Sequence, residues 1–211
     1  MTNEIELVLF DLGEVYLNGM VGVERGIAPK VGTHEESVWR HLNGEKLRRL
    51  FKGMCTEDEY WAEVIQEGQY PAEIDDMPTS VFLAEAMRSN FFEINGTAET
   101  VRALKKAGYG VSLISDHVKE WIIYCEQNYP LVDLFDNRYY SFDSGYTKKS
   151  PHAFHYALQQ AGGNPSKTLF VDDNPKNLTV AQSPQVGIAY THQFTDANSL
   201  RGTLPRYGIT I

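Results

Sequence analysis

Four polar features of this chain directly or closely follow short apolar or aromatic runs, and their side chains could carry out chemistry together. They are Asp11, Ser115, Lys148 and the adjacent pair Asp172-Asp173. They would supply a nucleophilic carboxylate, a hydroxyl, an ammonium group and two neighbouring carboxylates. Adjacent carboxylates repel each other and favour a bound cation, and oxygen donors without a soft ligand suit Mg²⁺. A lysine and a hydroxyl beside that ion would form a clamp for phosphate oxygens.

The runs that precede these features are typical of buried strands. Residues 7–10 are four consecutive bulky apolar residues, too short for a helix and flanked by polar residues. Further strands are expected at 111–114, 139–142, 168–171 and 188–190, and helical patterns separate them. This alternation predicts an α/β fold with a parallel sheet, whose strand carboxyl ends meet at one crevice. Alternatively, Asp11 caps a turn, as many Asp residues do.

A long stretch without a clear strand follows the first strand. Residues 19–33 carry several glycines and predict a loop or a weak helix entry, and helical patterns follow from Glu35 to Arg88. We therefore expect a Rossmann-like core formed by residues 1–17 and 89–211, with a small all-helical cap of residues 18–88 inserted after the first strand. An insertion at that position lies over the carboxyl end of the sheet and could act as a lid.

Composition narrows the classes of function. The net charge is −9, and no cluster of Lys and Arg is large enough for a nucleic-acid surface. We see no apolar run of membrane-spanning length and no signal peptide, and the two distant cysteines fit a reducing cytoplasm. We expect a cytoplasmic protein without nucleic-acid or membrane partners, a monomer or weak homodimer, whose ligand is a small molecule.

The polar features lie in motifs that resemble the haloacid dehalogenase-like (HAD) hydrolase superfamily. Apolar-Asp11-Leu-Gly-Glu-Val is similar to its first motif, and Leu-Ile-Ser115 to its second. The run from Lys148 to Phe154 is similar to the third, and Phe-Val-Asp172-Asp173-Asn-Pro-Lys-Asn to the fourth. Order and spacing agree over nearly the whole chain. The Asp-Leu-Gly of the first motif is similar to small bacterial sugar-phosphate phosphatases of the α-glucose-1-phosphate phosphatase type.

This resemblance implies a role for each site residue. Asp11 would attack phosphorus and form an aspartyl phosphate. Asp11, the Gly13 carbonyl and the Asp172/Asp173 pair would hold Mg²⁺; which of the pair binds directly is open, and we favour Asp173. Ser115 and Lys148 would bind the phosphate oxygens. Asp116 and Asn177 would belong to the substrate site, where Asn177 could also orient the acidic loop.

Two residues depart from the family pattern. Gly13 stands where phosphatases of the family usually carry a second Asp, which protonates the leaving group and then activates water. Losing a general acid typically costs on the order of 100- to 10,000-fold in rate. Glu14, Asp116 or His117 could substitute, although alternation along a strand points Glu14 away from Asp11. Asp116 itself replaces a more usual amide or Thr, and its charge would repel a phosphate unless it were paired or protonated.

Three functions therefore remain open from the sequence. The first is a Mg²⁺-dependent phosphatase that acts on a small phosphorylated metabolite, slowly because of Gly13. The second is a dehalogenase, since family dehalogenases also lack the second Asp because a halide needs no proton; they normally lack the metal-binding pair, which is intact here. The third is a non-catalytic homologue that binds a phosphorylated ligand. Cap side chains do not reveal the substrate.

Overall fold

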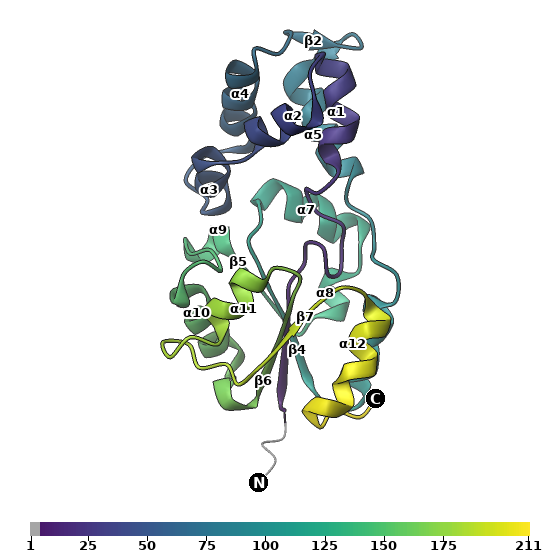
Figure 1. Cartoon of the computed structure of the whole chain (residues 1–211), viewed down its shortest axis with the longest axis vertical. Helices are drawn as coiled ribbons and strands as arrows, with labels where there is room; N and C mark the ends of the chain where they lie inside the picture. The colour runs from purple at the N-terminus through teal and green to yellow at the C-terminus, as the bar shows by residue number, and fades with distance from the viewer. Residues whose placement is uncertain (1–4) are drawn as a thin grey trace.

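The computed structural model describes residues 5–211, and a five-stranded parallel sheet forms its centre (Figure 1). The strand order is β5-β4-β1-β6-β7. The strands are β1 (Leu7–Phe10), β4 (Gly110–Ser115), β5 (Asn137–Tyr140), β6 (Thr168–Asp172) and β7 (Tyr190–Gln193). This architecture confirms the predicted Rossmann-like α/β fold. Because β1 lies between β4 and β6, its carboxyl end is flanked by the ends of both neighbours.

Alternate residues of each strand face opposite layers of helices. Leu7 and Leu9 of β1 pack in one apolar cluster, whereas Val8 and Phe10 pack in the other. The first cluster includes α10 (Pro151–Ala161) and α11 (Pro175–Ala181). The second includes α6 (Thr97–Lys106), α7 (Lys119–Asn128), α8 (Leu131–Leu134) and α12 (Ala197–Thr203). Burial on both faces explains why the central strands are continuous apolar runs.

Five helices follow β1 and lie beyond the carboxyl end of the sheet, at the top of Figure 1. They are α1 (Val23–Val31), α2 (Glu35–Leu42), α3 (Glu45–Phe51), α4 (Glu57–Gly68) and α5 (Thr79–Ser89). Residues 19–33 were expected to form a loop or a weak helix entry, and the loop is wrong, because most of the stretch is α1, even with Pro29 inside the helix. The all-helical prediction for this segment also missed a short hairpin, β2 (Glu73–Ile74) with β3 (Met77–Pro78).

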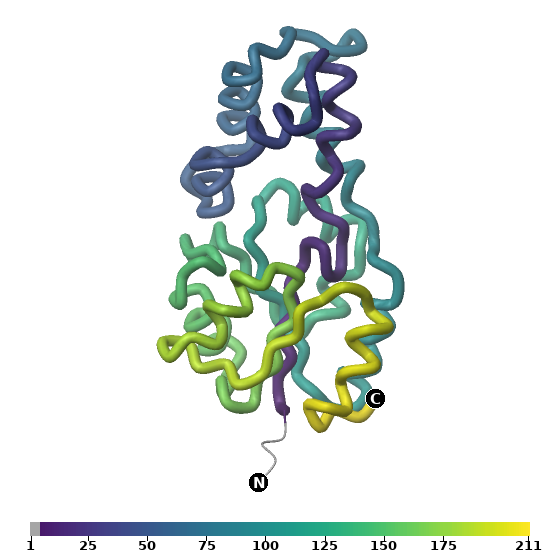
Figure 2. Tube along the Cα trace, viewed as in Figure 1, coloured from purple at the N-terminus to yellow at the C-terminus, as the bar shows by residue number. Residues whose placement is uncertain are grey.

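The chain enters and leaves this helical unit through two connecting segments that run side by side (Figure 2). The Asn18 N–H donates to the Phe92 carbonyl at 2.8 Å, and the Asn90 side chain donates to the Gly19 carbonyl at 2.6 Å. These bonds tie the two connections together. The assignment of residues 18–88 as a separate cap domain stays a prediction.

Two strand predictions were shifted along the chain. The run 139–142 was expected to be a strand, but β5 ends at Tyr140 and α9 (Ser141–Ser144) begins. The Ser141 hydroxyl bonds backbone groups of Phe51 and His117, which fixes this turn. Of the strand expected at 188–190, only Tyr190 belongs to β7, which runs on to Gln193, and Ile188 is buried in the preceding loop. Two 3₁₀ turns, η1 (Pro165–Lys167) and η2 (Leu204–Tyr207), complete the elements.

Over the described residues, the structure contains no helix whose length and apolar character would let it cross a bilayer.

Candidate active site

Asp11 lies directly after β1, where the sheet opens towards the helical unit. Its backbone N–H donates to the Val171 carbonyl at 2.9 Å, which continues the pairing of β1 with β6. The side chain is only 7% exposed. One carboxylate oxygen accepts the Leu12 N–H at 2.7 Å, and the other lies 2.5 Å from the Lys148 ammonium. Asp11 is therefore held in one orientation beside a fixed positive charge.

Lys148 lies between two carboxylates and is almost fully buried. Its Nζ is 2.5 Å from Asp11 and 2.7 Å from Asp172. Burial alone would lower the pKa of this ammonium group, but Asp11, Asp172 and Asp116 outweigh it and raise the pKa above its ordinary value. Lys148 therefore stays protonated and provides a permanent cation within the cluster.

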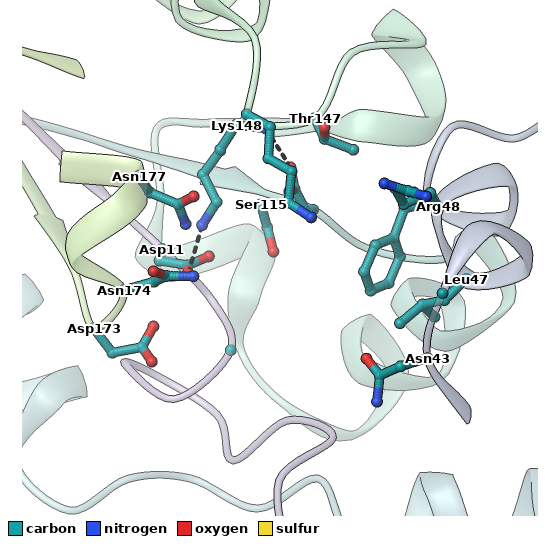
Figure 3. Close-up of a pocket in the computed structure, with 15 residues that line it drawn as sticks. Asp11, Asn43, Leu47, Arg48, Ser115, Thr147, Lys148, Asp173, Asn174 and Asn177 are labelled. Carbon is teal, nitrogen blue, oxygen red and sulfur yellow. Dashed lines mark hydrogen bonds and ion pairs between the residues drawn. The ribbon is translucent and has the colours of Figure 1, made fainter. Parts of the chain in front are cut away.

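The two acidic residues at the end of β6 have different surroundings. Asp172 is fully buried and accepts bonds from the Asn174 N–H and, through both of its oxygens, from the Asn177 amide. Asp173 is partly exposed and lines the cavity described below (Figure 3). Burial, and then the neighbouring Asp172 carboxylate, raise the pKa of Asp173. Asp172 thus holds Lys148 in place, while Asp173 faces open space.

These carboxylates could hold a metal ion. One oxygen each from Asp11, Asp172 and Asp173 lies within 4.8 Å of the others, and Gly13 lines the same cavity. A compact set of oxygen donors without thiolate or imidazole fits Mg²⁺. Each carboxylate buried without a cation would carry a large desolvation cost.

A cavity of about 410 Å³ separates the strand ends from the helical unit. From the core it is lined by Asp11, Gly13, Ser115, Asp116, Thr147, Lys148, Lys149, Asp173, Asn174 and Asn177. From the helical unit it is lined by Asn43, Gly44, Leu47, Arg48 and Phe51. In Figure 3, Asn43, Leu47 and Arg48 lie opposite Asp11 and Asp173. A ligand bound to the acidic cluster would therefore project its remaining part towards α3.

Most of the predicted site residues lie on the core side of this cavity. Asp11, Gly13, Ser115, Asp116 and Lys148 all line it, as do Asp173 and Asn177. Asp172 belongs to the same cluster but lies behind the surface, bonded to Lys148. The Asn177 amide nitrogen already donates to Asp172, so this geometry supports its orienting role.

Two of the three groups proposed to replace the missing acid are not available in this structure. Glu14 has a left-handed backbone with a φ of 59°, and its carboxylate accepts the Gly19 N–H at 2.9 Å. His117 is buried against Phe91 and Trp121, and burial lowers its pKa to about 4. Neither side chain lines the cavity. A histidine with that pKa is neutral near pH 7 and is a poor proton donor.

The sequence analysis missed the residues that face the site from the helical unit. These residues lie in or next to α3, where the sequence indicated only a helical pattern: Asn43, Leu47, Arg48 and Phe51. Nothing in that pattern distinguishes a cavity-lining side chain from an ordinary surface one. In the core, Lys149 and Asn174 are neighbours of predicted residues, and adjacency was the available signal.

The sequence of this chain was also matched to known protein families. A family model for haloacid dehalogenase-like hydrolases matches residues 5–183, which include every element from β1 to α11. The chain belongs to the haloacid dehalogenase-like hydrolase family. It is accordingly a hydrolase, and the resemblance noted in its four motifs is confirmed.

Similar proteins show the range of this family. A D-ribitol-5-phosphate phosphatase of Bacteroides thetaiotaomicron is 32% identical over 88 residues, which cover 39% of this HAD-like hydrolase and 42% of the relative. A HAD family enzyme from the same species, crystallised with magnesium and inorganic phosphate, aligns with a TM-score of 0.72 and 23% identity, covering 91% of this chain and 95% of its own. A dehalogenase aligns with a TM-score of 0.67 and 18% identity, covering 98% of both chains. The fold alone therefore does not choose between phosphate ester and carbon–halogen hydrolysis.

Proposed function

We propose that this HAD-like hydrolase is a Mg²⁺-dependent phosphatase that hydrolyses a small phosphate monoester through an aspartyl phosphate. The observation that carries this proposal is the buried Lys148 ammonium between Asp11 and Asp172, next to the partly exposed Asp173. A nucleophile, a fixed cation and a cluster of oxygen ligands meet at one cavity wall. The phosphatase relative, although it matches only part of the chain, supports the same reaction class.

Asp11 is the proposed nucleophile. Its carboxylate would attack phosphorus, forming a bond from one carboxylate oxygen to phosphorus while the ester oxygen departs. Lys148 and the hydroxyl of Ser115 would hold the oxygens of the phosphoryl group as charge develops on them. Both side chains are at most 2% exposed, so they are fixed before the substrate arrives. Water would then hydrolyse the acyl phosphate and release inorganic phosphate.

Asp11, Asp173 and the Gly13 carbonyl are the groups we propose as metal ligands, with Asp172 holding Lys148 behind them. When bound, Mg²⁺ would neutralise these carboxylates and stabilise negative charge on the phosphoryl oxygens. Asn177 would keep Asp172 from rotating, because its amide bonds both carboxylate oxygens at 3.1 Å.

The dehalogenase function stays as a second candidate because Gly13 provides no acid, which a halide leaving group does not require. The two candidates differ in their need for a metal.

The test measures para-nitrophenyl phosphate hydrolysis and halide release from 2-chloropropionate, each with Mg²⁺ and with EDTA. We expect only the first reaction, only with Mg²⁺, and its loss in Asp11→Asn. Glu14→Gln is the matched control, a carboxylate three residues away that does not line the cavity. Metal-independent halide release would overturn the proposal.

A further inference from the structure

The leaving group of a phosphate monoester needs a proton, and the cavity offers few donors. Among the described residues, the carboxyl groups that line it belong to Asp11, Asp116 and Asp173, and no histidine does. Asp11 is the proposed nucleophile, and Asp173 is a proposed metal ligand. Glu14 and His117 are held elsewhere by their own contacts. Asp116 is the remaining carboxyl group in the lining.

The position of Asp116 suits a proton donor. It directly follows Ser115, the last residue of β4, and both residues line the cavity in which we place the phosphoryl group. One of its oxygens accepts the Lys148 backbone N–H at 2.8 Å, which fixes the side chain at the cavity wall. Within residues 5–211 the structure gives its second oxygen no hydrogen bond. That oxygen is available to a ligand.

The surroundings of Asp116 also favour its protonated form. Burial raises the pKa of this carboxyl, and the nearby Lys148 ammonium and its backbone N–H only partly oppose that effect. A raised pKa keeps a carboxyl group protonated closer to neutral pH, and a carboxyl group must be protonated to act as a general acid.

We propose that Asp116 is the general acid and base of this enzyme and replaces the function that Gly13 cannot supply. This inference rests on the proposed phosphatase function. As the Asp11 oxygen bonds to phosphorus and the phosphorus–ester oxygen bond breaks, the Asp116 carboxyl gives its proton to that ester oxygen, and the alcohol leaves neutral. The resulting Asp116 carboxylate then takes a proton from the water that attacks phosphorus. Inorganic phosphate is released, Asp11 is free again and Asp116 is again protonated.

The test compares leaving groups in the Asp116→Asn variant. Asn keeps a side-chain oxygen for the Lys148 N–H, so the loop geometry is retained, but it cannot transfer a proton. The measurement is kcat/KM with Mg²⁺ for para-nitrophenyl phosphate, whose phenolate leaves without protonation, and for a hexose phosphate, whose alkoxide does not. We expect a loss of about 100-fold or more for the hexose phosphate and less than about 10-fold for the aryl ester. Glu14→Gln should change neither value.

A second variant tests whether the missing group is a proton donor. A Cβ added at Gly13 meets no atom within 4 Å, and the backbone there is not left-handed, so Gly13→Asp has room beside the cavity. In the Asp116→Asn background, Gly13→Asp should recover at least part of the hexose phosphate rate.

The outcomes separate the two proposals. Equal losses for both substrates would assign Asp116 a binding or structural role and overturn the inference. An unchanged hexose phosphate rate would overturn it as well. Both results leave the phosphatase function intact, because the wild-type protein is still active. A wild-type protein that hydrolyses neither ester would reject the phosphatase proposal, and the general-acid inference with it.

Discussion

Trp121→Phe should weaken the attachment of the helical unit to the core, because Trp121 donates to a buried carboxylate across that boundary. Glu57, in the first turn of α4, is 7% exposed. One of its oxygens accepts the indole N–H of Trp61 at 3.0 Å and that of Trp121 at 2.8 Å, and the other binds Arg88 at 2.5 Å. Trp121 belongs to α7 of the core, whereas the other two donors belong to the helical unit.

The magnitude follows from these contacts. Phe keeps an aromatic ring against Tyr60 and Phe91 but removes one N–H donor to a buried carboxylate that also pairs with Arg88. A hydrogen bond to a charged group contributes about 1.5–3 kcal/mol. We therefore expect the free energy of unfolding to fall by about 2 kcal/mol, which for a chain of this length lowers Tm by about 4–8 °C.

The assay is urea unfolding followed by circular dichroism, with a thermal melt as a second measure. Trp39→Phe is the matched control, since Trp39 is 37% exposed and, among residues 5–211, its indole N–H donates to no carboxylate. It should change the free energy of unfolding by less than about 0.5 kcal/mol. If Trp121→Phe proves as mild as Trp39→Phe, Glu57 does not join the two parts and our reasoning about this contact is wrong.

Three further perturbations follow from the site and its surroundings. In calorimetric titration, Asp173→Ala should weaken Mg²⁺ binding at least about 10-fold and Glu14→Gln should not; equal affinities would remove Asp173 from the ligand set. Lys148→Met leaves two buried carboxylates without their cation and should lower the free energy of unfolding by about 3–5 kcal/mol in metal-free urea titrations; a loss below about 1 kcal/mol would contradict the buried ion pairs. Gly53→Ala places a Cβ 3.0 Å from the Phe142 carbonyl at a φ of +66° and should lower Tm by a few degrees, and an unchanged Tm would show that this turn adjusts freely.

The core side of the site was predictable because its signals are local. A buried strand that runs directly into Asp11 or into Asp172-Asp173 places those carboxylates at a sheet edge whatever the rest of the chain does. Motif order then added Ser115 and Lys148. The shifted strand at 139–142 shows where such signals stop. Its aromatic run indicated a strand, but the Ser141 hydroxyl bonds backbone groups of residues 51 and 117, which no local pattern contains.

The helical side was not predictable for the same reason. Glu57 and Trp121 are 64 residues apart, and the local sequence around each indicated only a helical pattern. The cavity-lining role of Arg48 depends on how α3 lies over the strand ends. Strand alternation predicted that Glu14 points away from Asp11. In the structure its carboxylate accepts the Gly19 N–H, and this hydrogen bond depends on a left-handed turn at Glu14 that strand alternation does not describe.

The negative charge of the site favours both a bound Mg²⁺ and a protonated Asp116. Asp11, Asp116, Asp172 and Asp173 lie at the site with the cations Lys148, Lys149 and Arg48, so four ionised carboxylates would leave a surplus of one negative charge before any substrate arrives. A phosphate ester adds about two more, so binding requires a divalent cation, and a neutral Asp116 reduces the repulsion further. A haloacid would add one charge and require no proton for its halide. Dependence on Mg²⁺ and on the Asp116 proton should therefore occur together in a phosphatase. Dependence on the metal alone would point to another proton source, and dependence on neither to carbon–halogen hydrolysis.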